Sequence, residues 1–363
     1  MQFEFATATR IVFGRGKLRE LPELVRPFGH TALVLTGASP RARTAAEPLL
    51  RSLHDTGIQT IHRTVHGEPT VDSVRGPYPS VDMVIAFGGG SVLDAGKAIA
   101  ALMTNDGDPL DYVEVIGRGR PLQQPPKPFI AIPTTAGTGS EVTRNAVLGA
   151  PQHRVKVSLR SALMLPRLAL LDPDVCVVTP ACGLDALTQL IEPFVSRKAN
   201  PMTDALCREG MRRVRKSLRA AIDGDADARA DMALAAMWSG MALANAGLGA
   251  VHGFAGPLGG MYNAPHGALC AALLPAAWEV NERAVRERAG NTDLPARFAE
   301  VRELIGDPGS WPRDLGIPGL RAFGVRTEDF PIIVEKARAA SSMKGNPVEL
   351  ADTELHEILR RAW

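Results

Sequence analysis

The first half of the chain alternates short, nearly continuous apolar runs with segments of helical periodicity. The runs predict buried strands, and the periodic segments predict helices between them. Strands joined by helices are typical of a parallel sheet that is covered on both faces. We expect strands at residues 31–36, 59–65, 82–87, 129–132 and near 170–171, and a helix over 45–56.

Two stretches of this half are less regular. Residues 2–5 and 10–13 are short apolar runs joined by a threonine-bearing turn, which predicts a hairpin, and a helical pattern follows from Leu18. Between Val71 and Val81 the sequence leaves little room for a helix.

From Gly183 onward the hydrophobic pattern is helical. A chain of 363 residues is also too long for one ordinary core. We therefore predict an α/β domain with a parallel sheet over residues 1–180 and an all-α domain over 181–363, with the boundary near Thr179. Helices are expected at residues 185–196, 203–222, 228–248 and 268–284.

Three glycines follow the strand predicted at 82–87, and a helical segment begins directly after them. Glycines allow a ligand to approach the backbone, and the free N–H groups of a helix N-terminus favour negative charge. Gly88, Gly89, Gly90 and Ser91 therefore form a candidate diphosphate site. The strict G-x-G-x-x-G pattern is absent because Leu93 occupies its last position, so a simple tight turn is the alternative.

A second polar loop, PTTAGTGSEVT, follows the strand at 129–132. Loops at the carboxyl ends of parallel strands share one edge of the sheet, where ligands bind. The hydroxyls of Thr134, Thr135 and Thr138 are candidates to bind ribose or phosphate, unless the segment is only a threonine-rich surface turn. Lys156 either adds a cation to the same crevice or is an ordinary surface lysine.

The stretch VHGFAGPLGGMYNAPHG holds two of only eight histidines, His252 and His266. Its glycines and prolines predict a helix end, a turn and a new helix near His266. Asp185 and Gln189 lie one helical turn apart upstream, on one face. Together these residues suggest a metal site in a cleft between the two domains, although either histidine taken alone is more often a structural residue.

Composition excludes several classes of partner. The net charge is +2, with a sequence pI near 8.4 and no dense basic run, which argues against nucleic acid or an anionic membrane. Four cysteines without a C-x-x-C pair argue against a disulfide framework and a zinc–thiolate site. No stretch reaches about 18 apolar residues. We expect a soluble, cytoplasmic protein that acts on small polar metabolites.

Five ordered motifs carry a family resemblance: GGGSVLDAGK, PTTAGTGSEVT, GLDALTQLIEPFVS, VHGFAGPLGG and APHG. In this order they resemble the iron-containing (group III) alcohol dehydrogenases, whose architecture is also that of dehydroquinate synthase. The resemblance implies NAD or NADP bound by the N-terminal domain, a divalent metal (iron or zinc) in the helical domain, and hydride transfer between nicotinamide and an alcohol, aldehyde or ketone. It also implies a homo-oligomer, expected to be a dimer.

Carried over residue by residue, the resemblance assigns Asp185, His252 and His266 as catalytic metal ligands and adds Asp94 to the cofactor residues. Gln189 stands where the family has a further histidine, and a neutral amide oxygen is a weaker ligand for a transition metal. Gly256 replaces another histidine of the family, which removes a proton relay there.

The cofactor end departs from the family as well. Members specific for NAD often place an acidic residue after the first strand of the sheet. Here Gly37 and Ser39 occupy that place, and Arg41 and Arg43 follow. An arginine can pair with a 2′-phosphate, so we expect NADP to be accepted, unless both arginines are simply solvated.

The leading interpretation is an NAD(P)-dependent alcohol dehydrogenase, or aldehyde or ketone reductase, with a metal that polarises the substrate oxygen. Alternatives are a metal-independent reductase similar to maleylacetate reductase and a lyase similar to dehydroquinate synthase. A non-catalytic nucleotide-binding protein fits least well, because the aspartate, both histidines and both loops are all retained.

Overall fold

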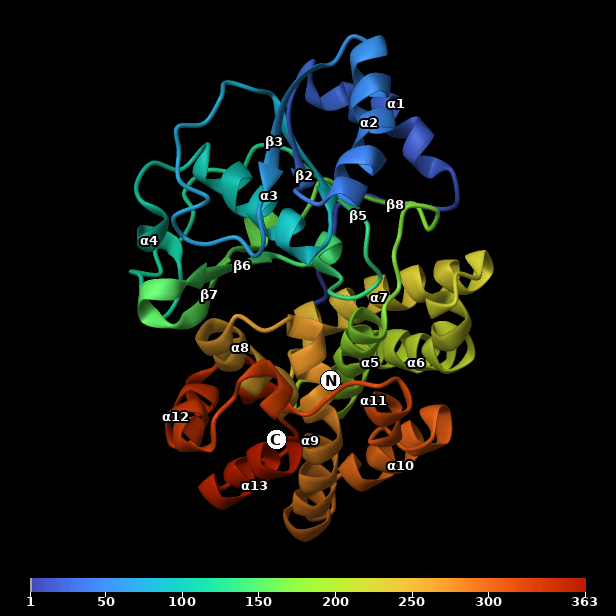
Figure 1. The fold of residues 1–363 in the computed structure, drawn as a ribbon, viewed down its shortest axis with the longest axis vertical. Coiled ribbons are helices and arrows are strands. Elements are labelled where there is room, and N and C mark those ends of the chain that lie inside the picture. Colours follow the sequence, from blue (N-terminus) through green and yellow to red (C-terminus); the bar gives the residue numbers. More distant parts are fainter. Residues whose placement is uncertain (1) are drawn as a thin grey trace. The chain divides into compact units, whose positions relative to one another are not determined.

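The computed structural model describes residues 2–363, which form two compact units (Figure 1). Residues 7–135 and 139–177 make up the N-terminal unit. Residues 178–363 make up the C-terminal unit, together with two short segments, 2–6 and 136–138. The main division follows Val177, slightly before the predicted boundary, and the two short segments were not anticipated.

The N-terminal unit is built on a six-stranded parallel sheet in the order β1-β8-β5-β4-β2-β3. A separate two-stranded antiparallel sheet is formed by β6 and β7, which come between β5 and β8 in the sequence. The predicted α/β fold with a parallel sheet is therefore confirmed. The elements of this unit are β1 (Ile11–Phe13), α1 (Leu21–Val25), β2 (Thr31–Gly37), α2 (Pro40–Asp55), β3 (Gln59–Val65), β4 (Met83–Gly88), α3 (Gly90–Leu102), α4 (Pro109–Tyr112), β5 (Phe129–Pro133), β6 (Asn145–Ala150), β7 (Val155–Arg160) and β8 (Leu168–Leu171).

The continuous apolar runs arise because both faces of this sheet are covered. Successive side chains of a strand point to opposite faces. In β2, Leu33 and Leu35 pack in a cluster with α3 and the β6–β7 pair, whereas Ala32 and Val34 pack with α1 and α2. Alternate positions of one strand thus belong to two different cores, and apolar residues fill the strand from Ala32 to Leu35.

The predicted N-terminal hairpin is wrong. β1 pairs with β8 in parallel, and residues 2–6 belong to the C-terminal unit. There the side-chain amide of Asn245 accepts from the Ala6 N–H at 2.7 Å and donates to the Ala6 carbonyl at 2.9 Å. A side chain far along the chain satisfies this backbone, and local pattern gives no sign of it. As expected, residues 66–82 form no helix in the described structure.

The C-terminal unit is all-helical, as predicted, and is organised around α5. Every residue of α5 from Gly183 to Val195 is buried. The helices of this unit are α5 (Pro180–Val195), α6 (Pro201–Ile222), α7 (Ala226–Ala246), α8 (Ala250–Tyr262), α9 (His266–Arg288), α10 (Leu294–Ile305), α11 (Ser310–Asp314), α12 (Phe330–Ala339) and α13 (Asp352–Ala362).

One helix boundary departs from the sequence prediction. α8 runs through Gly256 and Pro257, where a helix end was expected, and it ends at Tyr262. Pro257 removes one hydrogen bond within the helix. Packing of α8 against α9 and α12 holds the helix despite that loss. The new helix expected near His266 is confirmed, because α9 begins at that residue.

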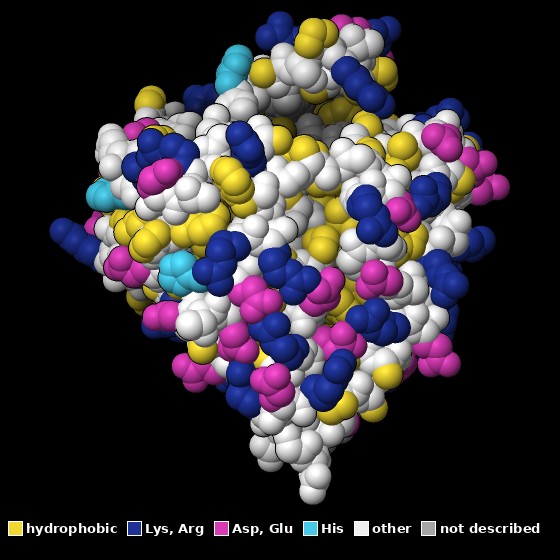
Figure 2. Space-filling view, turned by 60° about the horizontal axis from the view of Figure 1, so that its bottom comes forward, with side chains coloured by type: hydrophobic (Ala, Val, Ile, Leu, Met, Phe, Trp, Pro, Cys, Tyr) yellow, Lys and Arg dark blue, Asp and Glu magenta, His cyan; other side chains and the backbone are white. Residues whose placement is uncertain are grey.

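Acidic and basic side chains alternate over the face of the molecule shown in Figure 2. Ion pairs also link helices of the C-terminal unit, among them Arg283 with Glu357, Arg288 with Glu354 and Arg302 with Glu282. Partly exposed pairs of this kind contribute about 1 kcal/mol or less each. The interleaving agrees with the net charge of +2.

Within the described residues, no individual helix has both the length and the apolar character needed to cross a membrane. The pair α7 and α8 meets those criteria only when both helices are taken together, across a bend of 100°.

A buried charged group links α3 to the loop after β5. The Lys97 ammonium donates to the Ser140 carbonyl at 3.0 Å and to Thr143 Oγ1 at 2.9 Å, and it lies 3.2 Å from Asp94. Burial lowers the pKa of Lys97, against the pull of Asp94. Burial also raises the pKa of the nearby Glu141 carboxyl, from 4.5 to about 7.

The Glu141 carboxyl makes stability depend on pH. Its folded-state pKa lies above the unfolded value, so the folded state retains a proton that the unfolded chain loses, and stability falls as the pH rises from 4.5 through about 7. Glu141→Gln should therefore stabilise the protein at pH 8 by on the order of 2 kcal/mol and have little effect at pH 5.

Thermal unfolding midpoints of wild type and variant at both pH values provide the measurement. The matched control is Glu47→Gln, on the exposed side of α2, which should shift neither midpoint. An equal effect of Glu141→Gln at pH 5 and pH 8 would show that the Glu141 carboxylate is already ionised at no cost in the folded protein.

Candidate functional site

Three buried polar side chains lie on one face of α5. The helix begins at Pro180 after Thr179, whose hydroxyl accepts a hydrogen bond from the Cys182 N–H at 3.2 Å. Counting from Asp185, Gln189 and Glu192 follow at i+4 and i+7, so the three side chains form one stripe. All three are buried, with 2%, 3% and 6% exposure. A stripe of polar side chains in the centre of a helical core requires partners.

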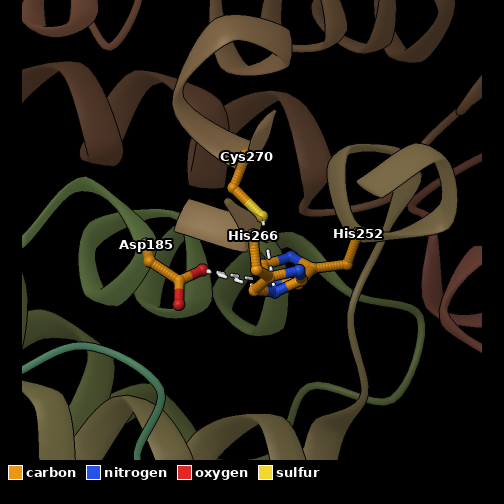
Figure 3. A group of neighbouring side chains, drawn as sticks. All are labelled: Asp185, His252, His266 and Cys270. Carbon is orange, nitrogen blue, oxygen red and sulfur yellow. Dashed lines mark hydrogen bonds and ion pairs between the residues drawn. The ribbon is translucent and has the colours of Figure 1, made fainter. Parts of the chain in front are cut away.

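The partners come from α8 and α9. Figure 3 shows Asp185, His252, His266 and Cys270 converging on one point, with ligand atoms all within 4.8 Å of one another. Asp185 Oδ1 lies 3.4 Å from His252 Nε2 and 3.8 Å from His266 Nε2. Cys270 Sγ lies 3.6 Å from His266 Nε2. The two histidines singled out in the sequence therefore meet the aspartate, as expected.

Glu192 fixes the orientation of His252. One carboxylate oxygen lies 2.6 Å from His252 Nδ1, and the other accepts from the Val251 N–H at 2.7 Å, at the start of α8. A carboxylate only accepts hydrogen bonds, so Nδ1 carries a proton, and Nε2 is the ring nitrogen that faces Asp185 and His266. The same carboxylate compensates an unpaired N–H at the N-terminus of α8.

Two polar atoms at the centre of the group lack a hydrogen-bond partner among the described residues. Asp185 Oδ1 and His252 Nε2 are buried and make no hydrogen bond of acceptable geometry with any residue in the range 2–363. Leaving such atoms unsatisfied costs free energy. A divalent cation bound between them would satisfy both atoms, and the donor set of carboxylate, imidazole and sulfur suits a transition metal.

The electrostatics point the same way. Burial opposes charge on His252, yet Cys270, Glu192 and Asp185 raise its pKa well above the ordinary value. Burial likewise disfavours charge on Asp185, but the facing histidines bring its pKa below the usual range. The surroundings are thus negative enough to hold a positive charge, which a metal ion would supply in place of protons.

A glycine permits α5 and α9 to approach. A Cβ at Gly267 would lie 2.5 Å from the Ala181 carbonyl oxygen and 3.3 Å from Asp185 Cβ. Only glycine at this position lets the first turn of α9 lie against α5, which brings His266 to Asp185. Close packing of α9 against α5 therefore explains why the APHG motif ends in a glycine, Gly267.

Gln189 makes a different contact from the one predicted. Its Oε1 lies 2.9 Å from Ser239 Oγ on α7, and Ser239 Oγ also donates toward the Ala236 carbonyl. The role of Gln189 as a ligand stays a prediction.

Cys270 was missed by the sequence reasoning, which considered only C-x-x-C spacing. The signal was present, because Cys270 follows His266 by four residues and so shares its helix face.

The predicted nucleotide loops meet at one edge of the sheet. Strand order reverses between β2 and β4, and ligands of open α/β sheets bind at such a switch point, outside the carboxyl ends of the strands. Thr36 pairs with Phe87, so Gly37 and Gly88 both lie at this edge. A Cβ at Gly88 would lie 2.5 Å from Val92, so glycine is needed for the turn into α3.

The loop after β5 lies beside the loop after β4. Gly88 pairs with Pro133, the Thr134 N–H donates to the Gly88 carbonyl at 3.0 Å, and a Cβ at Gly89 would lie 3.4 Å from Thr135. The structure thus brings together Gly88, Gly89, Gly90, Ser91, Thr134 and Thr135.

The remaining predicted cofactor residues have other contacts. Asp94 accepts from Ser140 Oγ at 2.6 Å and from the Val147 N–H at 3.1 Å, so it joins α3 to the loop after β5 and to β6. Ser39 caps α2 by accepting from the Ala42 N–H at 3.1 Å. Lys156 forms an ion pair with Glu68, and Thr138 lies in the segment grouped with the C-terminal unit. Their contacts with a nucleotide stay predictions.

Comparison with known proteins agrees with this geometry. The sequence profile "Iron-containing alcohol dehydrogenase" matches residues 8–173, and the profile of the C-terminal domain of the same family matches residues 179–363. The chain belongs to the iron-containing alcohol dehydrogenase family. This confirms the resemblance noted in the sequence, and the chain is an alcohol or aldehyde oxidoreductase of that family.

Individual members of the iron-containing alcohol dehydrogenase family are similar over the whole chain. The 1,3-propanediol dehydrogenase of Klebsiella pneumoniae is 34% identical, and the alignment covers 92% of each chain. The lactaldehyde reductase of Escherichia coli (strain K12) is 34% identical, and the alignment covers 97% of each chain. The crystal structure of a 1,3-propanediol oxidoreductase superposes with a TM-score of 0.89 at 31% identity and covers both chains completely.

Gly267→Ala tests whether the approach of α5 and α9 builds the site. The added methyl group must push backbone away from backbone, so we expect a loss of about 1–3 kcal/mol in stability and weaker zinc binding. Thermal unfolding and zinc titration against a competing chelator measure the two effects.

Gly256→Ala is the matched control, because a Cβ at Gly256 meets nothing within 4 Å. The control should keep the zinc affinity of wild type and gain up to about 1 kcal/mol in stability from helix propensity. Equal zinc affinity in both variants would contradict the assigned role of Gly267.

Proposed function

We propose that this protein is an NAD(P)-dependent, metal-dependent alcohol dehydrogenase that also reduces small aldehydes and ketones. The observation that carries the proposal is the buried convergence of Asp185, His252 and His266, with two ligand atoms left unsatisfied. The same chain carries glycine loops at the switch point of a parallel sheet.

The residues of the helical unit would hold and orient the metal. A divalent iron or zinc ion bound there supplies Lewis acidity to the oxygen of the substrate. Asp185 contributes negative charge, and Glu192 keeps His252 in the tautomer whose Nε2 is free to coordinate. The His266 side chain is 33% exposed, against 5% for His252 and 2% for Asp185, so the site is open on the side of His266. A substrate would enter from that side.

The N-terminal unit would bind the nucleotide. Nicotinamide supplies or accepts the hydride. The N–H groups of Gly90 and Ser91, at the start of α3, favour a diphosphate, and the hydroxyls of Thr134 and Thr135 lie beside them. Gly256 offers no side chain for proton transfer, so the proton must come from water or from a ribose hydroxyl.

Substrate turnover tests this proposal against its alternatives. The relatives are named for 1,3-propanediol and lactaldehyde, so these two compounds, with NAD(P)⁺ and NAD(P)H respectively, open the screen. We expect net conversion of cofactor, one equivalent per substrate, and a loss of at least about 100-fold in kcat/KM for His266→Ala, since Lewis-acid assistance contributes several kcal/mol. His54→Ala, an exposed histidine on α2, is the control.

The alternative hypotheses predict different results in the same turnover assay. A lyase that uses NAD catalytically, as dehydroquinate synthase does, would regenerate its cofactor and show no net conversion. A binding protein would show affinity for the dinucleotide without turnover. Full activity in His266→Ala would indicate a metal-independent reductase.

We further propose that NADPH serves at least as well as NADH. Gly37 leaves no carboxylate to repel a 2′-phosphate, and Arg41 and Arg43 lie exposed in the first turn of α2, after the carboxyl end of β2. An arginine–phosphate hydrogen bond is charge-assisted and strong. The double variant Arg41→Ala/Arg43→Ala should lower kcat/KM for NADPH by about tenfold or more and leave NADH nearly unchanged.

Arg51→Ala, exposed near the other end of α2, provides the control for a general loss of positive charge. Steady-state kinetics with both cofactors decide the question. A strong preference of the wild type for NADH would contradict this part of the proposal.

A further inference from the structure

The group of candidate metal ligands includes Cys270, a side chain to which the family pattern gives no role as a ligand. The family places a histidine where this chain has Gln189, yet the structure assembles four ionisable ligands in Asp185, His252, His266 and Cys270. We propose that the Cys270 thiolate is the fourth ligand and replaces the missing imidazole. The inference rests on the metal-dependent function proposed above and deepens it.

The separations between the ligand atoms fit one tetrahedral ion. With bonds of roughly 2.05 Å to nitrogen and oxygen and roughly 2.3 Å to sulfur, tetrahedral angles place nitrogen and oxygen ligands roughly 3.3 Å apart, and nitrogen and sulfur roughly 3.6 Å apart. The nitrogen–oxygen separations are 3.4 and 3.8 Å, and His266 Nε2 lies 3.6 Å from Cys270 Sγ. All four ligand atoms lie within 4.8 Å of one another, so the sulfur lies beside the same point as the other three ligands.

The position of Cys270 on α9 makes this arrangement stable. His266 and Cys270 are four residues apart, so both side chains leave the helix on one face, and Gly267 keeps that face against α5. Cys270 is fully buried, whereas the His266 side chain is 33% exposed. The sulfur therefore lies on the closed side of the group and leaves the open side to substrate.

Gln189 is the weaker candidate for the same role. Its Oε1 is paired with Ser239 Oγ at 2.9 Å, and coordination would have to compete with that hydrogen bond. A neutral amide also adds no charge, whereas a thiolate and the Asp185 carboxylate together neutralise a divalent ion. A donor set of one sulfur, two nitrogens and one oxygen suits zinc.

Cobalt(II) and zinc are the probes of this inference. We expect the metal-free protein with one equivalent of cobalt(II) to show a near-ultraviolet thiolate-to-cobalt charge-transfer band. Cys270→Ser should abolish the band and weaken zinc binding at least as much as the ~10–100-fold typical for loss of an outer-sphere partner. Gln189→Ala and Cys182→Ser, both on α5, should keep the band.

X-ray absorption of the zinc-loaded wild type gives the answer without any variant, which covers the case in which Cys270→Ser folds poorly. One sulfur at about 2.3 Å is expected. A shell of nitrogen and oxygen alone, or a cobalt band unchanged in Cys270→Ser, would overturn the role of Cys270 and leave the proposed function standing. If the wild type bound neither zinc nor cobalt, both the role of Cys270 and the proposed metal-dependent function would be overturned.

Discussion

The burial of two carboxylates on one helix is the constraint on which the C-terminal unit depends. Asp185 and Glu192 lie in a helix that is enclosed on all sides, and a buried charge is costly unless it is paired. Glu192 is paired within the protein, with His252 and with the N-terminus of α8. Asp185 Oδ1 is not satisfied by any residue in 2–363. The fold thus carries a local deficit of positive charge at the place where two imidazoles and a sulfur also converge.

In the N-terminal unit, glycines allow the close approach of backbone segments where the strands end and α3 begins. A ligand at the switch point needs backbone N–H groups to be accessible, and a helix needs to begin directly beyond the strand. Gly88 allows the first turn of α3 to fold over the end of β4, and Gly96 lets α3 lie close to Phe129 and Ala86 on the sheet. Lys97 and Asp94 then tie this helix to the loop after β5, so the loops that follow β4 and β5 are held together.

Much of this arrangement was predictable from the sequence, because it rests on local pattern. The buried strands, the glycine turn into α3 and the helical second half all follow from periodicity and turn residues, and Asp185 with both histidines follows from ordered motifs. The predictions that were wrong concern features set by contacts between residues far apart in the sequence. Asn245 draws residues 2–6 into the helical unit, and packing carries α8 through Gly256 and Pro257. The convergence of Cys270 with ligands from two other helices depends on tertiary packing, and a search limited to cysteine pairs overlooked its spacing from His266.

We infer that the buried group of Asp185, His252, His266 and Cys270 binds one metal ion and that oxidoreductase activity depends on that ion. Stepwise addition of zinc to the metal-free protein, with bound metal and NAD(P)H-linked turnover measured on the same samples, tests this claim most directly. We expect turnover to rise in proportion to bound zinc and to level off at one equivalent. Full turnover in protein that elemental analysis shows to be metal-free, unchanged as zinc is added, would contradict it.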